Sequence, residues 1–326
     1  MKLKQAFVLA TTVASLSLGS LAHATSNYPN QPIRVIVPFA PGGSTDIVAR
    51  IVVQEMSKIL GQSMVIENKA GAGGAIGAAE AARAKPDGYT LSLATVSTMA
   101  VNPACRPNDL PYDPQKDFAP VSNFVNTPNV IVVNPGVPAN NFAEFVQVLK
   151  DNPGKYTYAS PGICSIGNLN GEAFKQAVGV DLVHVPYKGS GPAVADTLGG
   201  QVHSLFDNLP SSMPHIQTGK LKAMAVAWPE RMKDIPDVPT YAEMGYPQLN
   251  NGVFYGLLAP AGTPPEIIEK LNKATQDALK EPKIIAALEK QGAFPAGNTP
   301  EEFAQQIKDN YDLAKSVVEK SQLEMK

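Results

Sequence analysis

The sequence predicts an α/β protein built from two lobes. Short apolar runs typical of strands alternate with amphipathic segments typical of helices, a pattern that indicates parallel sheets covered by helices on both faces. The alternation restarts near residue 130, and no long linker or low-complexity tract divides the two halves. We therefore expect two α/β lobes, with the chain passing between them more than once.

In the first half, the apolar run at 33–39 predicts a strand that Pro41-Gly42-Gly43 interrupts. A helix begins at Ser44 and ends before Gly61, because its apolar residues recur with the 3.6-residue period of a helix. Three further elements complete this half: a strand at 64–68, an alanine-rich helix at about 75–84 and a strand at 90–94.

The second half repeats the alternation. Strands are expected at 130–133, 156–159, 182–186, 204–207, 223–227 and 253–259. Helices are expected at 142–149, 165–178, 192–198, 265–279 and 300–320, and near His215. A proline-rich segment at 229–247 precedes the last of these strands.

The first 24 residues have the three parts of a secretory signal peptide. Lys2 and Lys4 form a basic start, residues 6–21 are almost uncharged and apolar, and Ala22-His23-Ala24 supplies the small residues before a cleavage point. An uncleaved membrane anchor is the weaker interpretation, since Ser, Thr and Gly dilute the apolar stretch. We expect cleavage near Ala24 and a soluble periplasmic protein.

Composition argues against several classes of function. With 27 basic and 29 acidic side chains and no long basic run, nucleic acid is not the expected partner. No spacing of His, Cys or carboxylates suggests a metal site, and the glycine run at 71–77 has Ile76 where a dinucleotide-binding loop needs Gly. We therefore expect no metal and no cofactor.

Cys105 and Cys164 are the two cysteines of the chain. An even number of cysteines in an oxidising compartment favours a disulfide. Two unpaired buried thiols are the alternative, because the sequence does not set the distance between the two Cα atoms.

Two similar loops are the candidate ligand-binding elements. Residues 39–46 and 159–165 each join a strand to the N-terminus of a helix and contain Gly, Ser or Thr. Free N–H groups and the helix dipole favour an anion at such positions, although ordinary capped turns have the same composition. Because sites in open α/β sheets lie at the carboxyl ends of strands, the two loops would face each other across a cleft.

Two alternatives stay open at this stage. Asp46 either caps its own helix or accepts a ligand ammonium group. A secreted serine hydrolase would use Ser165 or Ser190, but the G-x-S-x-G motif of such enzymes is absent from the sequence. The histidines at 184, 203 and 215 are expected to be structural.

Seven segments, in order along the chain, resemble the Bug/TctC family of extracytoplasmic solute receptors of tripartite tricarboxylate transporters. They are residues 38–46, 67–74, 85–90, 112–118, 185–189, 206–208 and 236–240. The resemblance implies a two-lobed periplasmic-binding-protein fold (type II, Venus-flytrap) that closes on a small organic carboxylate in the interlobe cleft. It further implies delivery to membrane permease subunits, with no enzyme activity; a periplasmic sensor for a signalling partner is the alternative.

The resemblance also implies domain boundaries and ligand contacts. Lobe 1 would comprise residues 25–125 and 246–326, and lobe 2 residues 126–245, in a protein that we expect to be a monomer. The implied contacts are Phe39, Pro41, Gly42, Gly43, Ser44, Thr45, Asp46, Thr95, Ser97 and Thr98 in lobe 1, and Ser160, Gly162, Ser165, Ile166, Asp207 and Asn208 in lobe 2.

Two positions depart from the family pattern in the second loop. Cys164 stands where the family often has Gly, and Asn168 stands where it often has His. Di- and tricarboxylates, acidic amino acids and aromatic acids all remain possible ligands. A Cys105–Cys164 disulfide would lie close to the cleft and restrict the motion of this loop.

Overall fold

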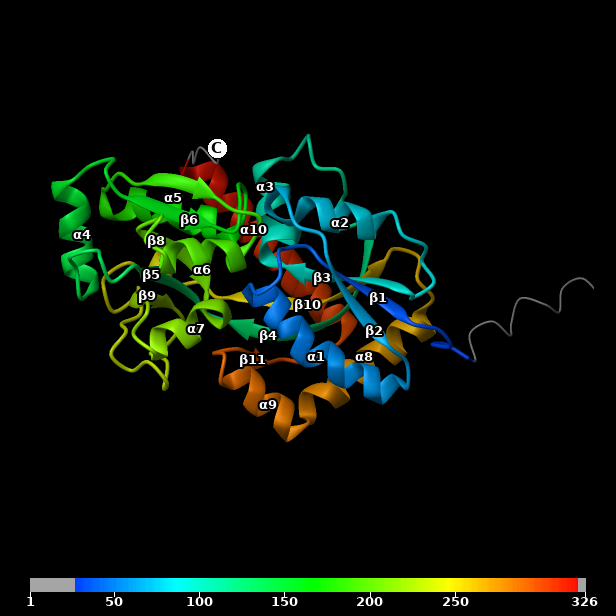
Figure 1. Ribbon diagram of the computed structural model, residues 1–326. Helices are drawn as coiled ribbons and strands as arrows, with labels where there is room; N and C mark the ends of the chain where they lie inside the picture. Colours follow the sequence, from blue (N-terminus) through cyan, green and yellow to red (C-terminus); the bar gives the residue numbers. More distant parts are fainter. Residues whose placement is uncertain (1–26, 322–326) are drawn as a thin grey trace, which may run out of the picture.

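The computed structural model describes residues 27–321, which form two lobes, each built on one β-sheet (Figure 1). The expected two-lobed α/β fold is confirmed. The signal peptide expected at 1–24 lies outside the described residues. Within the described chain, no helix has both the length and the apolar character needed to cross a membrane.

The first sheet has the strand order β11-β4-β10-β3-β1-β2. Its strands are β1 (Ile33–Val37), β2 (Met64–Asn68), β3 (Thr90–Thr95), β4 (Phe118–Thr127), β10 (Val253–Pro260) and β11 (Phe294–Pro295). Strand β1 pairs in parallel with β2 and β3, whereas β10 pairs antiparallel with both β3 and β4. The sheet is therefore mixed and not parallel throughout as expected, because β10 returns from the other lobe and enters in the opposite direction.

The second sheet has the order β7-β6-β8-β5-β9. Its strands are β5 (Asn129–Val133), β6 (Thr157–Ser160), β7 (Val183–Pro186), β8 (Ser204–Asn208) and β9 (Lys222–Ala227). Along β5, Ile131 and Val133 belong to one hydrophobic cluster, while Val130 and Val132 belong to another. Because alternate residues point to opposite faces, this sheet is buried on both faces.

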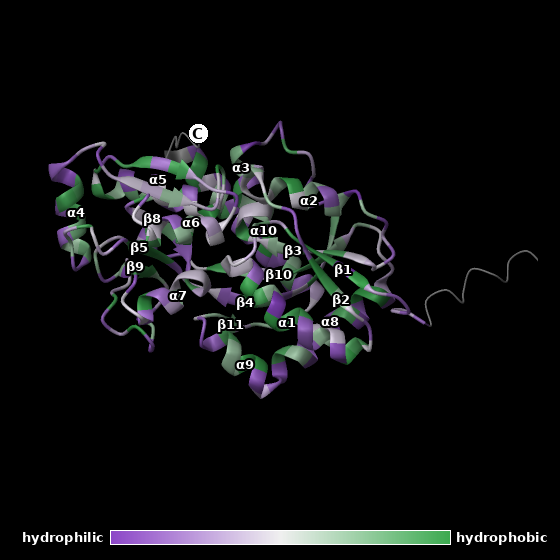
Figure 2. Cartoon of the chain, in the orientation of Figure 1, coloured by the Kyte–Doolittle hydropathy of each residue, from purple (hydrophilic) through white to green (hydrophobic). Residues whose placement is uncertain are grey.

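Helices cover the sheets. They are α1 (Ser44–Leu60), α2 (Ala75–Ala82), α3 (Asn102–Cys105), α4 (Phe142–Asp151), α5 (Ile166–Val178), α6 (Ser190–Leu198), α7 (Leu209–Gln217), α8 (Pro265–Lys280), α9 (Pro282–Glu289) and α10 (Pro300–Ser321). Figure 2 shows hydrophobic residues on strands such as β1 and β5, with polar residues along outer loops. Helix α1 ends where predicted, because Gly61 takes the left-handed conformation (φ 66°) that closes a helix.

The chain crosses between the lobes at Pro128, between β4 and β5, and again between β9 and β10. The two crossings are hydrogen-bonded to each other, since Asn129 Nδ2 donates to the carbonyl oxygen of Asn251 (2.6 Å). In the second crossing, Asn250 Nδ2 donates to the carbonyl oxygen of Trp228 (2.7 Å). These bonds hold the crossing segments side by side between the sheets.

A disulfide between Cys105 and Cys164 provides a third link between the lobes, and the expected pairing is confirmed. Cys105 ends α3 beside the first sheet, and Cys164 lies in the loop between β6 and α5 beside the second. Their Cα atoms are 6.0 Å apart, within the usual range for a disulfide.

We expect the native protein to weigh two hydrogen atoms less than its reduced form in intact-mass measurements. Replacing both cysteines, Cys105→Ser with Cys164→Ser, should lower the free energy of unfolding by about 4 kcal/mol, because the bond closes a long loop. Urea denaturation with and without reductant measures this loss. Reductant should leave the double variant unchanged; an equally insensitive wild type would contradict the prediction.

Candidate functional site

A small cavity lies between the lobes, where both loops predicted from the sequence meet. It is lined by Phe39, Gly43, Ser44, Thr45, Thr95, Val96, Ser97, Val253 and Tyr255 from the first lobe and by Pro161, Ile166, Ser190 and Asn208 from the second. None of these side chains carries a formal charge. The space open to the centre of a water molecule is about 10 Å³, which is room for about one water. A larger ligand therefore requires the lobes or the lining side chains to move.

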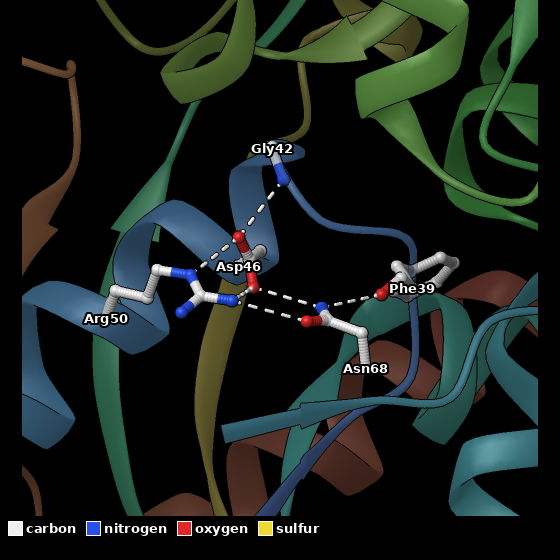
Figure 3. Close-up of polar contacts among 5 residues, drawn as sticks. All are labelled: Phe39, Gly42, Asp46, Arg50 and Asn68. Atoms are coloured by element: carbon white, nitrogen blue, oxygen red, sulfur yellow. Dashed lines mark hydrogen bonds and ion pairs between the residues drawn. The ribbon is translucent and has the colours of Figure 1, made fainter. Parts of the chain in front are cut away.

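The first loop is held in place by Asp46, as Figure 3 shows. The Asp46 carboxylate accepts hydrogen bonds from the backbone N–H of Gly42 (3.0 Å), from Arg50 Nε and Nη2 (2.9 Å each) and from Asn68 Nδ2 (3.0 Å). Asn68 Nδ2 also donates to the carbonyl oxygen of Phe39 (2.9 Å). Both ends of the loop are thereby fixed to α1 and β2.

This network gives Asp46 a structural role that differs from the helix cap that was one interpretation of the sequence. It caps the preceding loop at Gly42 and not the N–H groups of its own helix, whose N-cap residue is Gly43. Burial alone would raise the pKa of Asp46, but the hydrogen bonds from Arg50, Gly42 and Asn68 outweigh it and hold the pKa below its usual value. Asp46 is not among the residues that line the cavity.

The segment after β3 is stabilised by reciprocal hydrogen bonds between two threonines. The N–H of Thr98 donates to Thr95 Oγ1 (3.1 Å), and the N–H of Thr95 donates to Thr98 Oγ1 (3.2 Å). Ser97 instead reaches the other lobe, where its Oγ accepts a hydrogen bond from the N–H of Ile166 (3.0 Å). Thr95 and Ser97 line the cavity, whereas Thr98 is not part of its lining.

The serines of the second loop form hydrogen bonds within the loop and with the first turn of α5. Ser160 Oγ accepts from the N–H of Gly162 (3.2 Å), and Ser165 Oγ caps α5 by accepting from the N–H of Asn168 (3.2 Å). Cys164 has φ +60°, a left-handed conformation that favours glycine. The chain therefore keeps the backbone shape expected of a glycine at this position while using the residue to bond Cys105.

Ser160 also contacts a histidine, but the direction of the hydrogen bonds does not suit a nucleophile. Asn168 Oδ1 accepts from the N–H of Cys164, so its Nδ2 is the group that faces His184 Nδ1 (3.4 Å). This assigns the ring proton to His184 Nε2, which then donates to Ser160 Oγ (2.7 Å). A nucleophilic serine needs a base that accepts its proton, so the arrangement is that of a structural histidine.

Asp207, at the end of β8, is a buried carboxylate surrounded by serine hydroxyls. Ser190 Oγ donates to its Oδ1 (2.5 Å), while Ser211 Oγ and Ser212 Oγ donate to its Oδ2 (2.6 Å each). Burial raises the pKa of Asp207, and the hydrogen bonds from the serines and from the N–H of Asn208 offset this only in part. Ser190 thus has its proton directed to a carboxylate that sits behind the cavity wall.

Asn208 connects several elements at the base of the cleft. Its Oδ1 accepts from the hydroxyl of Tyr255 (2.7 Å), and its Nδ2 donates to Asn129 Oδ1 (2.5 Å) at the crossing segment. Its carbonyl oxygen accepts from Ser44 Oγ of the first lobe (2.9 Å). Asn208 therefore joins the cavity wall to the crossings between the lobes.

The lobes also meet backbone to backbone. The N–H of Ala40 donates to the carbonyl oxygen of Lys188 (3.0 Å). A Cβ placed on Gly191 would lie 2.2 Å from the carbonyl oxygen of Pro41, so only glycine allows this approach. In this structure the two lobes are closed on each other.

Eight predicted contacts line the cavity: Phe39, Gly43, Ser44, Thr45, Thr95, Ser97, Ile166 and Asn208. The other predicted contacts, Pro41, Gly42, Asp46, Thr98, Ser160, Gly162, Ser165 and Asp207, lie outside its lining. The sequence did not point to Val96, Pro161, Val253 or Tyr255. The sequence suggested Ser190 only as a possible nucleophile. Its position before the helix predicted at 192–198 is the signal that could have indicated a second anion-binding helix N-terminus.

Comparison with known proteins agrees with this geometry. Residues 48–323 match the tripartite tricarboxylate transporter family receptor. Protein BugT of Bordetella pertussis is 38% identical over 304 residues, 93% of each chain. A solved structure described as a periplasmic transporter has 65% identity and a TM-score of 0.91, covering 92% of this chain and all of its own. MatC from Rhodopseudomonas palustris, solved with bound malate, has 35% identity and a TM-score of 0.85, covering 89% of this chain and all of its own.

We expect Asp46→Asn to lower the free energy of unfolding by about 1–3 kcal/mol near neutral pH, because the hydrogen bonds to Arg50 lose their charge. Since folding lowers the pKa of Asp46, this contribution is present above the unfolded-state pKa and is lost as pH falls through the folded-state value. Urea denaturation should therefore show the difference shrinking as the pH falls below about 4, the usual pKa of an aspartate.

The matched control is Asp312→Asn, which removes an exposed ion pair to Lys308 on α10. That change should alter stability by about 0.5 kcal/mol or less at any pH. Equal effects of the two substitutions near neutral pH would contradict a special role for Asp46.

Proposed function

Because this chain belongs to the tripartite tricarboxylate transporter receptor family, we propose that it captures a small organic carboxylate between its lobes in the periplasm and delivers it to membrane permease subunits. The observation that carries the proposal is the interlobe cavity, to which both lobes contribute hydroxyl groups, with one side-chain amide, among apolar side chains and no charged one. The malate bound to MatC supports a carboxylate as the ligand class.

The N-terminus of α1 is the best candidate for the carboxylate. The first N–H groups of a helix have no partner within the helix, and the N-cap Gly43 offers them no side-chain oxygen. Ser44 and Thr45, the first two residues of α1, line the cavity. A carboxylate placed there would accept these N–H bonds and gain from the helix dipole. By contrast, the N-terminus of α5 is already capped by Ser165.

We further propose that the first sheet with its helices moves as one lobe and the second sheet with its helices as the other, with boundaries close to the expected 125/126 and 245/246; β4 extends the first lobe to Thr127. The hydrogen-bonded crossings at Pro128 and Asn251 would act as the hinge. Opening would break the contacts of Ser44 with Asn208 and of Ala40 with Lys188 and admit ligand to the cavity, within the range that the Cys105–Cys164 disulfide allows. Export after signal-peptide cleavage near Ala24 would place the protein beside its permease.

A thermal-shift screen of the protein without residues 1–24 tests this function. The panel contains citrate, succinate, malate, glutamate and benzoate, each beside its amide. A ligand at about 100 times its Kd adds roughly 2.7 kcal/mol, which should raise the unfolding midpoint by about 2 °C or more. We expect a shift with at least one acid and a smaller one with its amide.

The protein should be unfolded, dialysed and refolded before the screen, so that no ligand retained from expression occupies the site. A flat response of the refolded protein to every acid would contradict the proposed function. Equal shifts with an acid and its amide would contradict carboxylate recognition.

A further inference from the structure

The lobes are attached to each other at two separate places. One is the pair of crossing segments, which Asn129 and Asn251 hold together by a hydrogen bond. The other is the Cys105–Cys164 disulfide. In each sheet, the strand that leads to the disulfide (β3 or β6) lies two places from the strand beside the first crossing (β4 or β5). At the usual spacing of strands, the two attachments are therefore about 10 Å apart or more.

Two attachments leave the lobes one axis about which to rotate, which is the line between them. The packing agrees at both ends of this line. Beside the disulfide, a Cβ on Gly73 of the first lobe would lie 2.5 Å from the carbonyl oxygen of Ile163. At the crossings, a Cβ on Gly252 would lie 2.6 Å from the ring of Trp228. Because these contacts have no clearance, little displacement is possible at either end.

A second hollow lies across this axis from the ligand cavity. It is an apolar groove between α5 of the second lobe and α10 of the first, with Leu169, Ala173, Leu313 and Val317 in its lining. Val96 and Ile166 line both hollows, and Ile166 follows Cys164 by two residues. Gly252 lines the groove, whereas Val253, next in the chain, lines the cavity. The wall between the two hollows therefore runs along the axis, from the second crossing to the loop of the disulfide.

Rotation about such an axis changes the two hollows in opposite senses. The mouth of the cavity, where the N–H of Ala40 bonds the carbonyl oxygen of Lys188, parts when the lobes open. The same rotation brings α5 toward α10. In the closed structure the groove has about 50 Å³ open to the centre of a water molecule, against about 10 Å³ in the cavity.

Resting on the proposed function, we infer that the lobes rotate about this single axis, so that the groove between α5 and α10 narrows as the ligand cavity opens. The groove thereby controls ligand affinity from a distance. A side chain that fills it obstructs opening and shifts the population toward closed lobes, although it touches no ligand.

Spin labels measure the two hollows separately. Gln54→Cys on α1 with Ala195→Cys on α6 places exposed labels on the two helices whose N-termini meet at the mouth. Gln176→Cys on α5 with Asp312→Cys on α10 places exposed labels on the two sides of the groove. Double electron–electron resonance compares the refolded protein with and without the acid that gives the largest thermal shift. We expect the acid to shorten the first distance and to lengthen the second.

Filling the groove should raise affinity. Ala173 lines the groove and not the cavity, so Ala173→Phe occupies space that open lobes need. The Kd of the same acid should fall by about threefold or more, because the apparent Kd varies inversely with the closed fraction. The matched control is Ala304→Phe, at an exposed position of α10 outside the groove, which should leave the Kd unchanged. Unfolding midpoints without ligand report folding, and Ala173→Leu replaces the larger substitution if that one does not fold.

Removing the disulfide tests the axis itself. Cys105→Ser with Cys164→Ser leaves the crossings as the single attachment, so the lobes can also twist. Both distance distributions of the ligand-free protein should then broaden, and the groove should no longer narrow in step with the opening of the mouth. Distributions equal to those of the disulfide-bonded protein would contradict the axis; the unfolding midpoint of the double variant shows that it is folded.

The outcomes distinguish this inference from the proposed function. If an acid binds and the two distances change in the same sense, or either one stays constant, the inference is wrong and the proposed function stands. A Kd that groove filling leaves unchanged would also overturn the inference. If no acid of the panel binds, both fail.

Discussion

The arrangement of the site depends on one constraint, which is that two backbone loops from different lobes must approach closely enough to hydrogen-bond. The bond between Ala40 and Lys188 and the contact of Gly191 with Pro41 leave no room for side chains between the loops. The contacts that complete the closure are correspondingly small and neutral, such as the hydroxyl of Ser44 on the carbonyl of Asn208. The cavity is lined by short polar side chains together with apolar and aromatic ones, and the carboxylates of Asp46 and Asp207 are not part of its lining.

The two aspartates, Asp46 and Asp207, have opposite electrostatic environments. Asp46 is paired with Arg50, one helical turn away, and its pKa is lowered; Asp207 is surrounded by hydroxyls, and its pKa is raised. The first carboxylate is thereby stabilised in its charged form, whereas the second is buried among neutral hydroxyl donors. Both aspartates had been candidates for ligand contact on sequence grounds, and only their surroundings separate them.

Local patterns in the sequence predicted most elements, because the apolar periodicity and glycine stops that define α1, or the alternation along β5, are contained in a few residues. Strand β4 was not predicted, because Pro120, Ser122 and Asn123 interrupt any apolar pattern. The strand is stabilised by pairing with β10, which is far away in the sequence. The site shows the same limit of prediction, because contacts between segments far apart in the sequence are not visible in local patterns. The loop at 39–46 was identified from its glycines, whereas Asn68 and Tyr255 reach it only through the tertiary fold.

The position of the disulfide in the chain also bears on how the protein assembles. It closes a covalent ring from Cys105 to Cys164, and that ring contains the whole first crossing, with β4, Pro128 and β5. Strand β10, which fills the place between β3 and β4 in the first sheet, comes much later in the chain. A chain emerging from its N-terminus can therefore tie the two unfinished lobes together before the central strand of one of them exists. The bond then keeps β4 inside the covalent ring, next in sequence to β3 outside it, before β10 takes its place between the two strands.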